Sequence, residues 1–426
     1  MPLKLLSTFW MVLVLCSATM AEDWTYFRGP TGLAVSDATD VPTDVSPTNG
    51  VVWKSDLPGK AWSSPVVRGN RIYVTTAVPV GEEVVSVEEK FSKQTTNPYS
   101  LRAMCLDLAT GQVIWDQETS QVPAGVSIHP KNSHASGTPI VTDDRLFVHF
   151  GAYGTAALDL DGNVLWQRTV EYAPVHGSGG SPILWNDQLI FNCDGGDQAF
   201  VVSLDSATGS EQWRTPRDDQ GERTFSFSTP VVINTGRRHT LVSAASHAAY
   251  GYDPKTGKQL WKVRYPNKWS VVPQPIFAGG MIFVCTGYEG PAELLAIKPG
   301  GEGDVTESHV VWREDKFVPY NPTPAVHDGK LFMVSDNGIA SCRDVATGEL
   351  HWKQRLGDNY SASPIIVEDR VYFLSEEGKV TVIDAATEFR EVAQSEMDAR
   401  CLASMVPIDS GLLLRTEQSL YRFARK

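Results

Sequence analysis

Side chains suited to non-covalent binding recur at one position relative to a repeated motif. The motif is a small residue, a proline and a pair of apolar residues, and its last copy lacks the proline. Aromatic, imidazole or guanidinium groups stand three to six residues ahead of six copies: Trp62, His134, His176, Trp269, Tyr360 and Arg400. Aromatic rings offer stacking surface, imidazoles offer hydrogen bonds, and arginine suits an anionic group. The pattern predicts a binding site built from loops.

The sequence does not support covalent catalysis or a metal site. It contains no P-loop, no H-E-x-x-H and no G-x-S-x-G motif, and residues 176–181 have the glycine spacing of a flexible loop. Residues 159–163 imitate the start of a calcium loop, but the twelfth position is Val170 where a glutamate is needed. We therefore expect a non-catalytic binding or scaffold protein without a metal.

Turn chemistry gives a second explanation for several polar residues. Asp194, Asp336 and Asn337 occupy hairpin turns, where such side chains cap the backbone, and we interpret them as structural. His134 and His176 lie among Gly, Ser and Ala residues. Either contact with a ligand or a satisfied hydrogen bond explains these two histidines.

A repeated unit must position the binding residues, and residues 323–352 are its clearest copy. This unit reads as four short strands separated by Gly- and Asn-containing turns. It closes with an Asp, a Thr-Gly turn and a Trp four residues after the Gly. The tryptophans recur at intervals of 40 to 62 residues, which is typical of propellers: Trp53, Trp115, Trp166, Trp213, Trp261, Trp312 and Trp352. We assign them to the outermost strand of each unit, packed against the next unit, and not to redox chemistry.

Each unit opens with the motif of a small residue, a proline and two apolar residues. The openings and closings match in number only if the chain closes on itself. Eight openings are present, and the first closing, around Trp53, precedes all of them. The C-terminal part offers only three strands, so the N-terminal strand would supply the fourth and remove an exposed sheet edge. The sequence therefore predicts an all-β, eight-bladed β-propeller of four-stranded antiparallel blades, closed by the N-terminal strand.

This architecture gathers the candidate residues on one face. The first strand of each blade is innermost, so the loops that lead into first strands share a face with the loops that join second and third strands. Phe225 and Tyr320 stand in two further loops that lead into first strands. The second set of loops adds His247 and Tyr288, with Glu289, Glu376 and Glu377 as an acidic rim. We expect the candidate residues to converge in a funnel at the mouth of the central channel. Such a surface suits a protein, an extended peptide or an oligosaccharide, neutral or cationic around a single Arg400.

The closing signature, A-x-D-x-x-T-G-x-x-x-W, resembles the pyrroloquinoline-quinone-type (PQQ-like) propeller repeat over about residues 51–426. Quinoprotein alcohol dehydrogenases and BamB-like proteins share this repeat. Residues 23–30, 131–136 and 359–364 more closely resemble a widespread bacterial group of secreted PQQ-like propellers. The resemblance implies the propeller fold, and it leaves the function open because one fold hosts unrelated functions.

The resemblance also raises an alternative, a PQQ-dependent oxidoreductase. Relatives that use the quinone have adjacent cysteines over it, a calcium ion held by Glu, Asn and Asp, and a Trp beneath it. This chain has no Cys-Cys pair, and no acidic trio at matching spacing is recognisable. Trp62 or Trp269 could form the floor. We expect no cofactor and keep PQQ as the alternative.

Residues 1–21 read as a secretory signal, with Lys4, an apolar run up to Cys16 and small residues ending at Ala21. We expect cleavage after Ala21 and a periplasmic or extracellular protein. Leu15 disfavours a lipoprotein anchored through Cys16, because a small residue is wanted before the cysteine. Residues 22–50 read as an arm laid over the propeller, which occupies residues 51–426.

Two insertions, residues 79–99 and 118–136, have no counterpart in other units, and the first reads as a loop or small flap. The net charge of −13 disfavours nucleic acid and anionic lipid as partners. No apolar run after the signal could span a bilayer. The odd number of remaining cysteines allows no complete disulfide framework: Cys105, Cys193, Cys285, Cys342 and Cys401. We expect a monomer.

Overall fold

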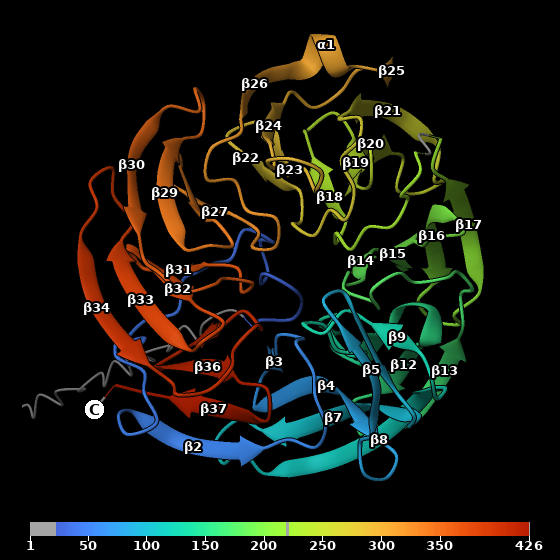
Figure 1. Cartoon of the computed structure of the whole chain (residues 1–426), viewed down its shortest axis with the longest axis vertical. Helices are drawn as coiled ribbons and strands as arrows, with labels where there is room; N and C mark the ends of the chain where they lie inside the picture. The colour runs from blue at the N-terminus through green and yellow to red at the C-terminus, as the bar shows by residue number, and fades with distance from the viewer. Residues whose placement is uncertain (1–22, 219–220, 426) are drawn as a thin grey trace, which may run out of the picture.

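The protein is described by a computed structural model that covers residues 23–218 and 221–425, so the predicted signal sequence lies outside the described residues. The described chain is almost entirely β-structure, and its sheets form a ring around a central axis (Figure 1). Eight of these sheets contain a meander of four antiparallel strands. The predicted all-β propeller class is confirmed.

Each blade runs from an innermost to an outermost strand. The strands of the first four blades are β3 (Val66–Arg68), β4 (Arg71–Pro79), β7 (Tyr99–Asp107) and β8 (Val113–Val122); β10 (Ile140–Val141), β11 (Arg145–His149), β12 (Thr155–Asp159) and β13 (Val164–Arg168); β14 (Ile183–Trp185), β15 (Gln188–Asp194), β16 (Ala199–Asp205) and β17 (Glu211–Pro216); and β18 (Val231–Asn234), β19 (His239–Ala244), β20 (Ala248–Tyr252) and β21 (Gln259–Arg264).

The remaining blades follow the same plan around the ring. Their strands are β22 (Ile276–Ala278), β23 (Met281–Cys285), β24 (Leu294–Ile297) and β26 (Val310–Glu314); β27 (Ala325–His327), β28 (Lys330–Val334), β29 (Ile339–Asp344) and β30 (Leu350–Arg355); β31 (Ile365–Val367), β32 (Arg370–Leu374), β33 (Lys379–Asp384) and β34 (Glu391–Glu396); and β35 (Val406–Ile408), β36 (Gly411–Arg415), β37 (Ser419–Phe423) and β2 (Val51–Asp56).

Several short elements decorate this ring. Two strands pair in parallel with a blade, β1 (Val35–Ser36) with β31 and β25 (Gly303–Asp304) with β21. A 3-10 helix, η1 (Gly151–Tyr153), follows β11, and a single-turn helix, α1 (Thr306–His309), precedes β26. None of the described helices is long and apolar enough to cross a membrane.

The N-terminal strand completes the last blade. β2 pairs antiparallel with β37, with Lys54 opposite Tyr421 and Ser55 opposite Leu420. Trp53, in this strand, donates a hydrogen bond from its indole nitrogen to the carbonyl of Leu108 in the first blade, at 3.0 Å. Residues from both ends of the chain therefore share one sheet, and the edge of β37 is covered.

The repeat tryptophans join each blade to the next. Trp115 donates to the Leu160 carbonyl at 2.9 Å, and Trp166 donates to the Ser206 carbonyl at 2.9 Å. The indole ring of Trp166 also lies over the glycine of the neighbouring blade's turn. A Cβ built on Gly209 would come within 2.6 Å of Trp166. The Thr-Gly turn and the tryptophan are thus two halves of one contact. They stand in different blades, which explains why both recur with the same period.

Hydroxyl groups link the innermost strands in two runs, from the first to the fourth blade and from the fifth to the eighth. In each run, the Ser or Thr ahead of one blade's first strand accepts a hydrogen bond from the backbone N–H at the same position of the preceding blade. The bonds run from Ser64 N–H to Thr138, from Thr138 to Ser181, from Ser181 to Thr229, from Gln274 to Thr323, from Thr323 to Ser363 and from Ser363 to Ser404. These bonds satisfy buried backbone donors around the channel wall.

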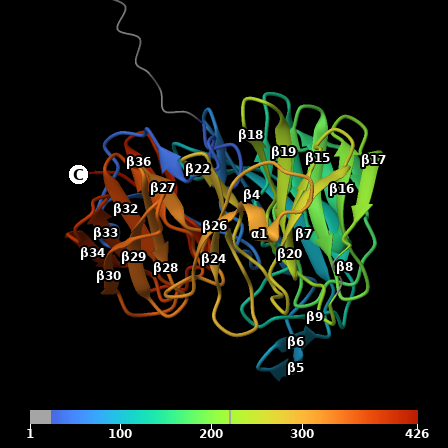
Figure 2. The ribbon, with the colours of Figure 1, turned by 90° about the horizontal axis from the view of Figure 1, so that it is seen from above.

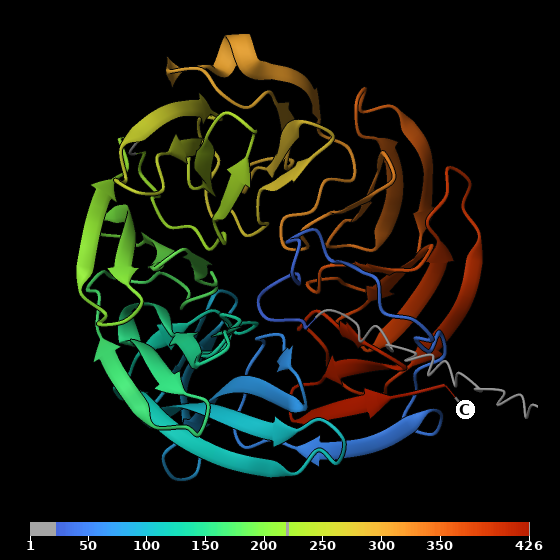
Figure 3. The same cartoon turned by 180° about the vertical axis from the view of Figure 1, so that it is seen from behind.

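The arm, residues 23–50, crosses the rear of the ring (Figure 3). Its backbone carbonyls accept hydrogen bonds from Val67 of the first blade, Val141 of the second and Ile366 of the seventh. Arg28 is 3% exposed, and it donates to the carbonyls of Thr323 and Pro324 in the sixth blade. The arm therefore ties together blades that are far apart in sequence.

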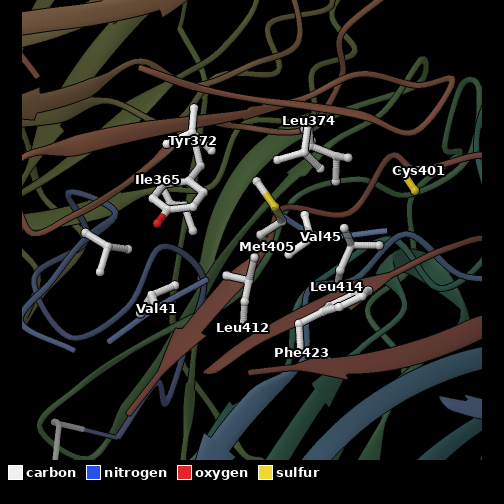
Figure 4. Close-up of a cluster of buried hydrophobic side chains, with 14 of the residues drawn as sticks. Val41, Val45, Ile365, Tyr372, Leu374, Cys401, Met405, Leu412, Leu414 and Phe423 are labelled. Atoms are coloured by element: carbon white, nitrogen blue, oxygen red, sulfur yellow. The ribbon is translucent and has the colours of Figure 1, made fainter. Parts of the chain in front are cut away.

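The arm also contributes to the hydrophobic core. Val41 and Val45 pack into a cluster between the last two blades, together with Tyr372, Leu412 and other buried side chains (Figure 4). Clusters of the same kind lie between other neighbouring blades. The core is thus distributed around the ring at the blade interfaces.

A flap projects from the face opposite the arm (Figure 2). It consists of β5 (Val85–Glu89), β6 (Ser92–Thr95) and β9 (Ser127–Ile128), which form a three-stranded sheet in the order β5-β6-β9. The first insertion supplies β5 and β6, and the second supplies β9. We call the face that carries this flap and the loops into the innermost strands the mouth face, and the opposite face the rear face.

Candidate binding face

Seven aromatic rings form an unbroken run over the mouth face, which we call the aromatic belt. The ring centroids lie 4.2 to 6.0 Å apart along the series Phe91, His129, His176, Phe225, Trp269, Tyr288 and Tyr320. Its members come from the flap, from the loops into five different blades and, for Tyr288, from the turn after β23. Most contacts are edge-on or tilted, and Tyr288 stacks on Tyr320 with an interplanar angle of 13°. Such geometries are favourable for aromatic pairs.

Backbone contacts fix the flap side of the belt. The carbonyl of His176 accepts hydrogen bonds from the His129 N–H, at 3.2 Å, and from the Asn132 side chain, at 2.8 Å. His176 has a left-handed backbone, with φ of 65°. The loop into the third blade is therefore tied to the loop into the second, and the two imidazoles meet edge to face at 5.5 Å.

The other side of the belt is fixed around Trp269. The Trp269 N–H donates to the Tyr288 carbonyl, which joins the loop into the fifth blade to the turn after β23. The guanidinium of Arg223 lies 4.5 Å from the Trp269 ring and 3.9 Å from the Glu289 carboxylate. His247 donates a hydrogen bond from Nε2 to the Arg223 carbonyl, at 3.1 Å, and therefore holds the loop that carries Arg223.

The belt is electrically neutral at neutral pH. Burial, with a contribution from His176 and Lys131, lowers the pKa of His129, and burial lowers the pKa of His176. Both imidazoles are thus uncharged at pH 7. Tyr288 is 38% exposed and Phe91 is 56% exposed, whereas Phe225 is buried. The belt therefore offers apolar, neutral surface at its ends and a packed middle.

A second cluster surrounds Trp62 on the same face. The cationic groups of Arg400 and Lys60 lie 5.6 and 5.2 Å from the Trp62 ring. The Trp62 indole donates to the Lys131 carbonyl at 2.8 Å, and the Lys131 ammonium pairs with Glu376 at 3.0 Å. The expectation of a single cation at the mouth needs correction, because Arg400 has two lysines nearby.

Tyr360 and His134 lie outside both the belt and the cluster around Trp62. Tyr360 is fully buried in the cluster between the sixth and seventh blades, so the prediction that it lines the mouth is corrected. Its backbone N–H donates to the Asp336 carbonyl, and this bond holds the residue in the blade interface. His134 is 4% exposed and packs between Tyr99 and Tyr153, at 4.8 and 5.9 Å.

The turn carboxylates have structural partners. Asp194 forms a bidentate pair with Arg217, with both N–O distances 3.0 Å, and both side chains are buried. Asp336 accepts bonds from the Tyr320 backbone and from Asn321. Burial raises the pKa of Asp336, and these hydrogen bonds act in the opposite direction. Both carboxylates therefore position the mouth loops.

Sequence reasoning missed three residues of this face: Phe91, His129 and Arg223. The first two lie in the insertions that have no counterpart in other units, and that irregularity was the available signal. Arg223 carried no such signal, because only the fold brings it over Trp269.

Within residues 23–218 and 221–425, no group of three or more His, Cys, Asp and Glu side chains is arranged to hold a metal ion. The five cysteines of this part of the chain are free and buried. The contacts described on the mouth face are stacking, hydrogen bonding and charge pairing.

The ring of four-stranded blades, with its interlocking Trp and Thr-Gly signatures, defines a propeller of the PQQ-like class. The family described as outer membrane protein assembly factor BamB matches residues 96–234, 197–305 and 302–391. These segments cover more than half of the chain, which belongs to this family. A search among curated proteins found no match.

Solved structures show the same fold at low sequence identity. BamB from Moraxella catarrhalis is 13% identical, with 88% of this chain and 97% of that chain covered and a TM-score of 0.58. The quinohemoprotein alcohol dehydrogenase from Comamonas testosteroni is 11% identical, with coverages of 94% and 80% and a TM-score of 0.65. A europium-containing methanol dehydrogenase is 12% identical, with coverages of 94% and 98% and a TM-score of 0.50.

Proposed function

We propose that the protein is an exported, non-catalytic binding protein whose mouth face holds an extended polypeptide along the aromatic belt. The observation that carries the proposal is the unbroken run of seven rings across loops of several blades. Loops on a rigid scaffold are where binding residues concentrate. A linear series of rings suits a linear ligand, because successive side chains of an extended chain can each meet a ring.

The energetics favour a partner with apolar side chains. Covering a large apolar side chain contributes about 1.5–3 kcal/mol, so the exposed rings of Phe91 and Tyr288 are costly to leave bare and favourable to cover. Neutral imidazoles at His129 and His176 add hydrogen bonds without charge. The family description, an outer membrane protein assembly factor, supports a polypeptide as the partner.

Charge sets a second preference. The chain carries a net charge of −13, and Glu289 beside the belt is largely exposed. Acidic surroundings attract neutral or cationic segments and repel acidic ones. A polypeptide that carries aromatic or aliphatic residues together with lysine or arginine fits both properties of the surface.

The alternative is a PQQ-dependent oxidoreductase, which the likeness to quinohemoprotein alcohol dehydrogenase raises. The residues do not fit the quinone. The two candidate floors, Trp62 and Trp269, already have cationic groups over their rings, from Lys60 and Arg400 in one case and Arg223 in the other. Four of the buried cysteines lie in separate strands, and Cys401 lies in the loop before β35. The described residues provide no group of three or more His, Cys, Asp and Glu side chains that could hold a metal ion.

The polypeptide proposal is tested with an array of overlapping peptides from a bacterial outer-membrane β-barrel protein. Wild type is expected to bind peptides that combine aromatic and basic residues, and Trp269→Ala with Tyr288→Ala is expected to weaken binding about tenfold or more. Trp185→Ala is the matched control, because Trp185 contacts His239 away from the belt. Equal binding by wild type and the belt variant would place the peptide site elsewhere.

The quinone alternative needs a separate measurement. The purified protein is incubated with PQQ and calcium, and absorbance and dye reduction with alcohols are recorded. We expect neither a stoichiometric coloured complex nor turnover. A complex with turnover would reverse the proposal.

A further inference from the structure

A cavity of about 800 Å³ lies on the mouth face between the flap and the edge of the last blade. Glu83 and Lys93 of the flap line one side, and Lys60 and Glu417 line the other. Its lining shares no residue with the aromatic belt. The volume falls within the range of about 300–1,000 Å³ that is usual for small-molecule sites.

His134 is one of the residues that line this cavity, and its imidazole has one unpaired nitrogen. The residue is 4% exposed, and its Nδ1 is buried without a hydrogen-bond partner among the described residues. Burial lowers the pKa of His134 to about 4, so the imidazole is neutral at pH 7 and has one donor and one acceptor nitrogen. A buried polar group without a partner is unfavourable, so a turn of the imidazole that brings Nδ1 to a ligand hydroxyl or amide in the cavity would be favoured.

The charges that line the cavity cancel in pairs. Lys60 pairs with Glu417 at 2.8 Å, and Lys93 pairs with Glu83 at 2.6 Å. The only other charged residues of the lining, Lys54 and Asp56, pair with each other at 2.8 Å. An anionic ligand would have to compete with a carboxylate at each lysine, and a cationic ligand would have to compete with a lysine at each carboxylate. Neither charge is favoured.

The polar lining also disfavours an apolar ligand. Ion pairs and the amide and hydroxyl groups of Gln418, Ser419 and Ser133 would lose hydration without gaining partners. A ligand with many hydroxyl groups avoids this cost, because each hydroxyl both donates and accepts and so matches ammonium, carboxylate and imidazole groups together. Tyr99, whose ring lies 4.8 Å from that of His134, adds an aromatic surface to the lining.

We propose that this cavity is a binding site for a neutral oligosaccharide, separate from the polypeptide surface of the aromatic belt. His134 forms the inner end of the site, and the pairs Lys60–Glu417 and Lys93–Glu83 form its sides. The ligand lies beneath the flap, so β5 and β6 cover it from the solvent side.

The test is calorimetry of the full mature chain with soluble neutral oligosaccharides built from glucose, mannose or N-acetylglucosamine, and with an oligomer of galacturonic acid. At least one neutral oligosaccharide is expected to bind with a millimolar or lower Kd. His134→Phe is expected to weaken it about tenfold or more, which corresponds to about 1.4 kcal/mol. The double variant Glu83→Gln, Lys93→Gln changes the partly exposed ion pair of the flap. It is also expected to weaken saccharide binding, and it tests the proposal if His134→Phe does not fold.

The matched control is Glu211→Gln with Arg214→Gln, an ion pair at 2.7 Å on β17 outside the cavity, which is expected to leave saccharide binding unchanged. The proposal is overturned if no neutral oligosaccharide binds, if the cavity variants bind it as wild type does, or if the uronic acid oligomer binds more tightly. Loss of peptide binding in the belt variant with intact saccharide binding separates this site from the proposed function.

Discussion

At the scale of single residues, the contact between neighbouring blades depends on a tryptophan in one blade and a glycine in the next. Gly257 is the clearest example, because its backbone has φ of 71° and a Cβ there would lie 2.4 Å from the Trp213 ring. Glycine is therefore required twice, by the left-handed backbone and by the indole of the preceding blade. The same double requirement holds at Gly111 below Trp53.

Gly257→Ala should therefore cost more stability than an alanine at an unobstructed glycine with the same backbone. Gly329 is the matched control, with φ of 71° and no atom within 4 Å of a built Cβ. Both variants carry a left-handed alanine, which costs about 1–2 kcal/mol, and overpacking against Trp213 adds about 1–3 kcal/mol in Gly257→Ala. Urea unfolding measures the difference, and equal losses would show that the indole contact is unimportant.

Buried histidines predict acid sensitivity. Burial lowers the pKa of His149 to about 3 and that of His134 to about 4, below the usual value near 6.5. Because the unfolded chain binds these protons more readily, the free energy of unfolding falls as the pH drops from about 6.5 toward each folded-state pKa.

His149→Gln should flatten this dependence by up to about 1.4 kcal/mol per pH unit between pH 6 and pH 4. Unfolding free energies at several pH values provide the measurement, with His351→Gln as a surface control for the loss of an imidazole. An identical slope in wild type and His149→Gln would contradict a neutral buried His149.

At the scale of elements, the flap and the closing strand β2 have different structural roles. β2 covers the edge of β37 and carries Trp53 to the first blade, so it belongs to the ring. β5 and β6 extend beyond the ladder of the first blade, in which β4 pairs directly with β7. The flap can therefore be changed without opening a blade.

Deletion of residues 23–56 should give an aggregating product, because the edge of β37 is left unpaired and buried side chains of the last blade lose their cover. Replacement of residues 82–96 by a short Gly-Ser linker is the control and should remain monodisperse. Size-exclusion chromatography and thermal unfolding distinguish the two. A monomeric deletion product with the wild-type unfolding temperature would refute the role of β2 in closure.

At the scale of the whole molecule, the arm fastens the rear face while the mouth face stays available. Arg28 donates to carbonyls of its own segment, Gly32 and Leu33, and to those of Thr323 and Pro324. Its charge is thus distributed over four carbonyl groups in a buried position. Burial lowers the pKa of Arg28 to about 9, which leaves it charged at pH 7.

Arg28→Met should lower the free energy of unfolding by about 2–4 kcal/mol, because it leaves buried carbonyls without donors. It should also make the arm susceptible to limited proteolysis. Arg425→Met is the control, since Arg425 pairs with Asp40 of the arm at an exposed site, 2.9 Å away, and such pairs contribute little. An equally small effect of both substitutions would show that the arm is held by its apolar contacts alone.

The propeller fold could be predicted from the sequence, because the blades of a propeller repeat at a regular spacing along the chain. Turn residues such as Gly348, the spacing of the tryptophans and the early position of Trp53 each follow from local chemistry or simple counting. The same patterns indicated which loops share a face. Positions along the chain therefore predicted the class of architecture and the side of the ring on which the loops lie.

The side chains that meet on this face could not be predicted in the same way, because they depend on packing between blades. Tyr360 turns into a blade interface although it precedes its strand as Trp269 does, because its backbone N–H bonds to Asp336 of the neighbouring blade. Phe91 and His129 join the belt because two insertions combine into one flap sheet. Spacing fixes the face on which a loop lies, whereas side-chain direction and contacts between loops depend on packing across blades, which the chain order does not encode locally.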